Sequence, residues 1–318
     1  MRHATTTCRG HIGRFLAAGC LVLLGAGALA TVPRVAPARA SEPRAAATPA
    51  PATVVSGPAT SFRGARGLVS DWGHIRQVAA WLRYRTPPRR VVYLLGGSGS
   101  RESVTDEAGW SRQLRRKTGR RVAAYVLSSN CQTFVEDARI IKALPKGRGI
   151  ALINVGLSRF IMYHVPDTIS SRAERKTPPS PWWQHHYDGR LPHSLSWKRE
   201  YVRHWHTNRL GVFTARYDGR LEELTALVDL CLRRGVRPVL LEMPLCTVAA
   251  RHDLDEPLAR YRRDCKALAA ERGIRYLSFL SSIRLRSSDF YDLWHLLRTG
   301  RAKWQDRLSR ELVAKHIL

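Results

Sequence analysis

The sequence predicts an α/β protein in which a central parallel sheet of five strands lies between two layers of helices. Five short apolar segments alternate with helical segments along the chain, which is the pattern of a three-layer α/β domain. Each strand is a continuous apolar run, as expected for parallel strands that are covered on both faces. The chain has 318 residues, of which 44% are hydrophobic and 25% charged. This composition provides a large core and excludes a small disulfide-stabilised fold or a wholly disordered protein.

Residues 1–40 have the features of an export signal. Three arginines and no acidic residue precede an apolar stretch at 15–32, and Ala38-Arg39-Ala40 fits the small-x-small rule for cleavage. We therefore expect cleavage after Ala40 and a secreted protein. The apolar stretch, about 18 residues, is also long enough for an uncleaved membrane anchor with the domain facing outside, and this alternative stays open.

Residues 41–67 are rich in alanine, proline, serine and threonine, which predicts a disordered, flexible linker before a single domain at 68–318. The chain carries 53 Lys and Arg against 25 Asp and Glu, and the export signal contributes only five of these positive charges. This excess fits either a genome-wide preference for arginine or an anionic partner such as a cell-wall polymer. No nucleic-acid partner is expected, because the chain is exported and has no zinc-finger spacing or RNA-binding aromatic motif.

The first half of the domain alternates helix and strand. An amphipathic pattern predicts a helix at 68–84, and the apolar run RVVYLLGGS at 90–98 predicts a buried strand that ends in glycines. A helical stretch then ends near residue 118. The expected elements that follow are a strand at 121–127, a helix at 133–144 and a strand at 149–155.

In the second half, an apolar stripe that includes Leu224, Leu227 and Val228 predicts a helix at 218–234. The expected elements after it are a strand at 236–242, a helix at 255–272, a strand at 274–279 and a helix at 299–316. The residues before this half, 160–217, are predicted to form a long irregular insertion. Loops of this length within a compact domain are usually functional or disordered, and the aromatic content argues against disorder.

The turn after the first strand carries a candidate nucleophile. Ligands of such sheets bind at the carboxyl ends of the strands, and the sequence GGSGS at 96–100 stands at this edge. The turn lacks the GxGxxG spacing and the lysine of phosphate-binding loops. Ser98 follows the glycine pair directly, where its oxygen can project over the sheet, although it can also cap a helix. Ser100 lies two residues further and is better placed to cap the helix.

Asp292 and His295 near the C-terminus form a candidate acid and base pair. Their i to i+3 spacing places both side chains on one side of a turn or helix start, so the carboxylate can orient the imidazole. A histidine held in this way can take the proton of a serine hydroxyl. We therefore expect His295 to serve as the general base for Ser98.

Together the two blocks resemble those of the SGNH/GDSL hydrolase superfamily. Gly96-Gly97-Ser98 is similar to the family's Gly-Asp-Ser-like block, and Asp292 and His295 match its terminal Asp-x-x-His block. The resemblance covers about residues 90–310. It implies a flavodoxin-like fold, esterase or acyltransferase activity with these three catalytic residues, and no metal or organic cofactor. The terminal block also looks like that of exported bacterial family members that act on acyl groups of polysaccharides.

Two other blocks depart from the family pattern, and both concern the donors that would face the oxyanion. The family's second-block glycine corresponds to Ser128, whose backbone N–H survives the change. The third block, normally Gly-x-Asn-Asp, begins here at Gly156 and has Ser158 in place of the asparagine. Asn130 or Asn154 could supply the missing amide instead. Losing one such donor typically costs about 100-fold to 1000-fold in rate.

The insertion at 160–217 contains several tryptophans and histidines. Flat aromatic rings beside basic groups suit stacking on a sugar ring, although a local subcore is an equal alternative. The candidate substrate-binding residues are Arg159, Trp182, Trp183, Trp197 and Trp205. No metal site is predicted, because the His204-x-His206 pair has no carboxylate or cysteine pattern near it.

Two cysteines form a candidate disulfide. Four cysteines remain after removal of the export signal, and an oxidising compartment permits bridges. Cys246 follows a strand and Cys265 lies on the next helix, so this pair is the easiest to close. Cys131 and Cys231 are expected as buried thiols.

The sequence as a whole predicts an exported serine hydrolase of SGNH type that cleaves or transfers O-acyl esters, with an acylated cell-wall glycan or another small ester as its substrate. The alternative is a catalytically impaired relative that binds anionic wall polysaccharide through its basic surface. A membrane would be a partner only if the N-terminal apolar stretch stays uncleaved.

Overall fold

The computed structural model describes residues 71–84, 90–162, 185–250 and 252–318. The predicted export signal and linker lie outside the described residues and stay predictions. No helix of the described residues is long and apolar enough to cross a membrane.

The sheet has five strands, all parallel, in the order β2-β1-β3-β4-β5. The strands are β1 (Arg90–Gly96), β2 (Val122–Ser128), β3 (Ile150–Asn154), β4 (Arg237–Leu241) and β5 (Arg275–Leu277). This order is that of flavodoxin-like folds, in which the chain reverses its direction of progress between β1 and β3 and leaves a crevice at their carboxyl ends. The predicted fold class is therefore confirmed.

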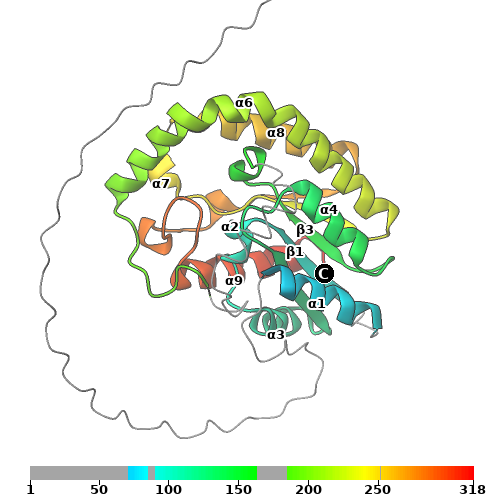
Figure 1. The fold of residues 1–318 in the computed structure, drawn as a ribbon. Helices are drawn as coiled ribbons and strands as arrows, with labels where there is room; N and C mark the ends of the chain where they lie inside the picture. Colours follow the sequence, from blue (N-terminus) through cyan, green and yellow to red (C-terminus); the bar gives the residue numbers. More distant parts are fainter. Residues whose placement is uncertain (1–70, 85–89, 163–184, 251) are drawn as a thin grey trace, which may run out of the picture. The chain divides into compact units, whose positions relative to one another are not determined.

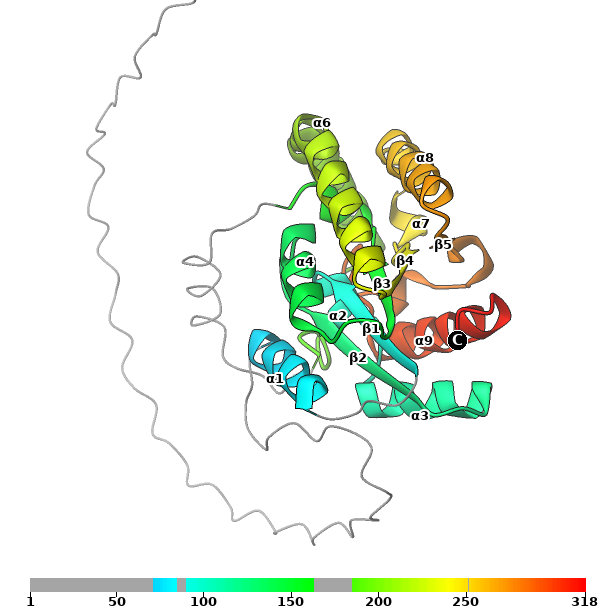
Figure 2. The ribbon, with the colours of Figure 1, turned by 90° about the vertical axis from the view of Figure 1, so that its right-hand side faces the viewer.

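Helices cover both faces of the sheet. The helices are α1 (Asp71–Tyr84), α2 (Ser98–Arg101), α3 (Glu107–Thr118), α4 (Phe134–Ala143), α6 (Leu195–Arg233), α7 (Thr247–Ala250), α8 (Asp255–Glu271) and α9 (Arg298–Ala314). In Figure 2, α3 and α9 lie together on one side of the sheet and α4, α6 and α8 on the other. The buried indole of Trp110 on α3 donates to Ser309 on α9 at 3.2 Å, which joins the first pair.

The helix α6 is much longer than predicted. Residues 195–217, which were expected to be irregular, form its first half, and the helix arches over the sheet in Figure 1. The side chain of Ser194 caps its start by accepting from the N–H of Trp197. Val202, Trp205 and Phe213 continue the buried stripe of the second half toward the N-terminus, so the helix gains its stability from packing. Residues 195–217 of the predicted insertion are therefore helical, and residues 163–184 lie outside the described residues.

Within the described ranges, three short 3-10 helices lie after strands and before α9. They are η1 (Leu157–Phe160), η2 (Leu280–Ser282) and η3 (Ser287–Asp289). The first of these follows β3, next to the turn that follows β1. It therefore stands beside the crevice where the strand order reverses.

Candidate active site

The nucleophile turn is a sharp change from β1 into the four-residue helix α2. Gly96 has a φ of +142°, and a Cβ there would lie 2.6 Å from the Cβ of Asn154. Only glycine therefore fits at the end of β1, beside Asn154 at the end of β3. The helix closes at once, since the N–H of Glu102 donates to the carbonyl of Ser98 at 2.9 Å. Ser98 is left partly exposed at the first position of α2.

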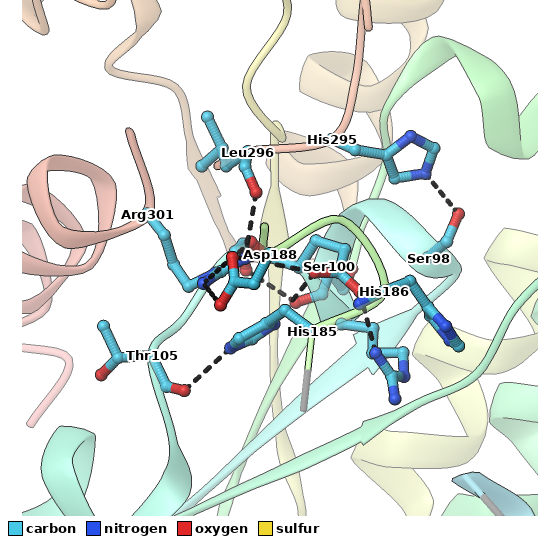
Figure 3. Close-up of polar contacts among 12 residues, drawn as sticks. Ser98, Ser100, Thr105, His185, His186, Asp188, His295, Leu296 and Arg301 are labelled. Carbon is cyan, nitrogen blue, oxygen red and sulfur yellow. Dashed lines mark hydrogen bonds and ion pairs between the residues drawn. The ribbon is translucent and has the colours of Figure 1, made fainter. Parts of the chain in front are cut away.

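Ser98, His295 and Asp292 form one continuous chain of hydrogen bonds. The Ser98 Oγ lies 2.8 Å from His295 Nε2, and His295 Nδ1 lies 2.7 Å from Asp292 Oδ2 (Figure 3 shows the first contact). The serine comes from the turn after β1 and the pair from a loop 194 to 197 residues later, so the fold brings the predicted residues together. In this arrangement Nδ1–H donates to the carboxylate and Nε2 faces the hydroxyl as a base.

The loop that carries Asp292 and His295 is a tight turn. Its ends are closed by an antiparallel bridge between Phe290 and Leu296, and Leu293 at its centre is fully buried. The Oδ1 atom of Asp292 accepts from the N–H of Trp294 at 2.9 Å and of His295 at 3.0 Å. Burial alone would raise the pKa of Asp292, but the hydrogen bond and charge of His295 and these two N–H groups outweigh it and lower the pKa. The carboxylate therefore stays ionised at neutral pH.

A buried lysine binds the backbone that leads into this loop. The Nζ of Lys198 on α6 donates to the carbonyls of Ser287 at 2.6 Å and Phe290 at 2.8 Å, and to the Ser287 hydroxyl at 3.2 Å. Its three protons thus find three acceptors, which is the condition under which a buried ammonium is tolerated. On the other side, a Cβ on Gly300 would overlap the carbonyl of Asp289, so glycine is required where α9 packs on the loop.

The candidate oxyanion donors stand at or after the carboxyl ends of β2 and β3, the two strands that flank β1. Ser128 ends β2 opposite Gly96, and its hydroxyl donates to the Leu94 carbonyl at 2.9 Å, which leaves only its backbone for the oxyanion. Ser158 lies in η1, partly exposed, and its hydroxyl has no hydrogen bond to any residue in the described ranges. Asn130 is exposed, and its side-chain oxygen accepts from the Cys131 thiol at 3.5 Å.

Asn154 is not available as the replacement amide. Its Nδ2 donates to the Ser100 hydroxyl at 2.9 Å, and its Oδ1 accepts from the N–H of Gly156 at 2.7 Å. Ser100 in turn is fully buried inside α2, so it does not cap the helix as expected. The Ser100 and Asn154 pair instead ties the nucleophile turn to the end of β3.

Arg159 is a structural residue and not a substrate-binding one. The side chain is 1% exposed, its guanidinium donates to Asp137 at 2.5 Å and to the carbonyl of Gln132, and it lies 4.5 Å above the ring of Phe134. The assignment of Arg159 to the substrate was wrong, because its guanidinium is buried and bound to groups of this chain. Its contacts join η1 to the start of α4, which fixes the loops after β3 and β2 relative to each other.

Of the predicted tryptophans, the two within the described residues, Trp197 and Trp205, pack against other aromatic side chains. Trp205 is 2% exposed and packs against Phe213, so it belongs to the core and its assignment to the substrate was wrong. Trp197 is 40% exposed, but His193 stacks on its ring at 3.7 Å and Tyr201 at 5.3 Å. Both rings lie nearly parallel to the indole, so part of its surface is already covered by stacking. Trp182 and Trp183 lie outside the described residues.

The predicted disulfide is absent. Cys246 and Cys265 are both free and buried. The N–H of Cys246 donates to the Leu293 carbonyl at the loop of the candidate base, whereas Cys265 sits in α8 near the charge of Glu242. The two thiols face different surroundings despite their closeness in sequence. Cys231 is buried as expected, whereas Cys131 is exposed.

A group of residues around Glu102 was missed by sequence analysis. Glu102 is fully buried behind the nucleophile turn and contacts Arg101, Arg301 and His185. The only local indication was that Glu102 follows the nucleophile by four positions. An acidic residue at this place is equally typical of a helix-capping group. Arg301 and His185 lie 199 and 83 residues away, and no local pattern connects them.

No group of three or more metal-ligating side chains is found among the described residues. His204 and His206 are exposed on α6, and His204 contacts Asn208 at 3.0 Å.

No protein-family model matches the sequence, and no curated protein matches it. Among solved structures, the chain is similar to a GDSL-like lipase from Bacteroides thetaiotaomicron, with 10% identity over 76% of this chain and 98% of that chain and a TM-score of 0.40. It is similar to a lipolytic G-D-S-L family member from Veillonella parvula, with 11% identity, 71% and 98% coverage and a TM-score of 0.42. It is also similar to phospholipase A1 from Streptomyces albidoflavus, with 9% identity over 70% of this chain and 99% of that chain and a TM-score of 0.40. Likeness at this level concerns the fold, so the function is inferred from the residues of this chain.

Proposed function

We propose that the protein is a serine ester hydrolase or acyltransferase of SGNH type. The observation that carries the proposal is the chain of hydrogen bonds from Ser98 through His295 to Asp292, at 2.8 and 2.7 Å. A nucleophile, a base and a group that orients the base at these distances are the components of covalent acyl transfer. They also stand at the crevice where sheets of this order bind their ligands.

In the first half-reaction, the Ser98 Oγ attacks the ester carbonyl while His295 Nε2 takes the hydroxyl proton. Asp292 holds the imidazole by its Nδ1–H and stabilises the positive charge that forms on the ring. The N–H groups of Ser98 and Ser128 and the hydroxyl of Ser158 would donate hydrogen bonds to the tetrahedral oxyanion. His295 then protonates the leaving alcohol, and the acyl group remains on Ser98.

In the second half-reaction, water or an acceptor hydroxyl attacks the acylated serine. His295 removes its proton and returns one to Ser98 as the acid or new ester leaves. Hydrolysis and transfer thus use the same residues and differ only in the acceptor. The proposal includes an acyl ester on an exported glycan as substrate and a location outside the cell, both supported by the signal-like N-terminus and by the family resemblance of the two blocks.

The proposal is tested by hydrolysis of 4-nitrophenyl acetate by the purified domain. Ser98→Ala is expected to abolish turnover, and His295→Ala to lower kcat/KM by at least about 1000-fold, because the serine loses its base. Both variants should keep the unfolding midpoint of the wild type within a few degrees, since Ser98 and His295 are only partly buried. Absence of turnover by the folded wild type would favour the alternative, a non-catalytic binder of anionic wall polysaccharide.

A further inference from the structure

The segment at 185–190 is fastened directly to the back of the nucleophile turn. His185 Nδ1 lies 2.9 Å from Glu102 Oε2 and its Nε2 lies 2.8 Å from the Thr105 carbonyl, while the N–H of His186 donates to Glu102 Oε1 at 3.1 Å (Figure 3). Both ring nitrogens of His185 therefore face oxygen atoms of the nucleophile turn. Glu102 is the common acceptor of this segment.

Asp188 fastens the other end of the same segment. Its carboxylate pairs with Arg301 on α9 at 3.1 Å, and Arg301 also donates to the carbonyls of Glu102 at 3.0 Å and Leu296 at 3.1 Å (Figure 3). Arg301 is 1% exposed, so its position is fixed. One guanidinium thus joins the segment, the nucleophile turn and the residue that follows His295.

Between these two attachments, Tyr187 is placed against the candidate base. The centroid of its ring lies 4.6 Å from that of His295 at an interplanar angle of 34°, and 4.5 Å from that of Tyr291 at 23°. Burial and the charge of Asp292 raise the pKa of Tyr187 to about 12, so the phenol is neutral whenever the base works. The Tyr187 hydroxyl has no hydrogen bond to any residue in the described ranges, so the contact depends on the ring.

An aromatic ring in this position has two physical effects on the base. It limits the rotation of the imidazole about its side-chain torsions, because the ring is packed on one face. It also attracts the imidazolium that forms when Ser98 gives up its proton, because a cation within about 6 Å of an aromatic face is stabilised by the ring quadrupole. The second effect is present only after proton transfer, so it lowers the barrier and not the energy of the resting state.

We propose that Tyr187 is a positioning residue for the candidate base, held over His295 by the attachments of His185 and Asp188 to the nucleophile turn and α9. The inference rests on the proposed function, since it assigns Tyr187 a role in the same proton transfer. It assigns the described end of the insertion to the catalytic machinery and not to a separate sugar platform.

The test compares Tyr187→Phe, Tyr187→Leu and Tyr187→Ala in 4-nitrophenyl acetate hydrolysis. Phenylalanine keeps the aromatic face and should retain kcat within about twofold. Leucine keeps an apolar cover but has no quadrupole, so it should lower kcat by about threefold to thirtyfold with little change in KM, and alanine at least as much. Leu191→Ala is the matched control, since Leu191 follows the 185–190 segment directly, is 88% exposed and should leave both constants unchanged.

Three outcomes overturn the inference. Wild-type kcat in Tyr187→Leu would show that the aromatic face is not needed, and a rise in KM at constant kcat would make Tyr187 a substrate contact. A loss in Tyr187→Phe equal to that in Tyr187→Leu would assign the effect to the hydroxyl. A wild type without esterase activity would remove the proposed function itself, which the unsubstituted protein reveals before any variant is made.

Discussion

Ser98 and Ser100 lie two residues apart in the nucleophile turn and have opposite environments. Ser98 is partly exposed and faces His295, whereas Ser100 is buried and accepts from Asn154. Ser98 was predicted as the nucleophile because it stands directly after the glycine pair. In the structure, its hydroxyl is the one that contacts His295. The role of Ser100 was not accessible from sequence, because its partner comes from another strand.

At the residue scale, Ser158 is expected to be the oxyanion donor that replaces the family's asparagine. Ser158→Ala should lower kcat/KM for 4-nitrophenyl acetate by about 100-fold to 1000-fold, because the developing charge loses one hydrogen bond. The unfolding free energy should change little, since the hydroxyl has no hydrogen bond to the described residues. Asn130→Ala is the paired variant, and a larger rate loss there than in Ser158→Ala would transfer the role to Asn130.

At the scale of elements, the least predictable part was the segment before the second half of the sheet. Thr207, Asn208 and Gly211 are weak helix formers, and the many histidines and tryptophans favoured a binding loop. The helix α6 forms there because its apolar side reaches the core through Val202 and Trp205. Packing of α6 on the core therefore outweighs the weak helix propensity of these residues. A continuous stripe of apolar residues through 195–233 would have predicted the helix.

The attachment of 185–190 to Glu102, directly after α2, should make stability depend on pH. Burial would raise the pKa of Glu102, but His185 and Arg101 together lower it from 4.5 to about 2. A carboxyl whose pKa is lower in the folded state stabilises the fold above its unfolded pKa, and this contribution is lost as the pH falls toward the folded value. The expected loss between about pH 4.5 and pH 2 is on the order of 3 kcal/mol.

Urea unfolding of the wild type and of Glu102→Gln across this pH range checks the expectation. The variant should be less stable at pH 7, because the cationic groups around Glu102 lose the charge that they pair with. It should also show a flatter dependence on pH below 4.5, since the titrating group is gone. Equal pH dependence in the two proteins would show that other carboxyl groups dominate acid unfolding.

At the scale of the whole molecule, features with a local sequence pattern could be predicted, and features that depend on the meeting of distant residues could not. All five strands and the positions of Ser98, Asp292 and His295 could be predicted, because apolar runs and short motifs are local. The predicted disulfide and the assignment of Trp205 and Arg159 to the substrate were wrong, since burial and thiol geometry are set by packing. The Glu102 attachments involve three separate segments and had no signature to find.

The most direct test of the central claim is mass-spectrometric mapping of a fluorophosphonate adduct on the folded protein. The probe reacts with a serine that has been activated by a neighbouring base. The account predicts one adduct on Ser98, its loss in Ser98→Ala, strong reduction in His295→Ala, and normal labelling in a folded Ser100→Ala protein. An adduct on Ser100 that persists in Ser98→Ala, or no adduct on the folded wild type, would contradict it.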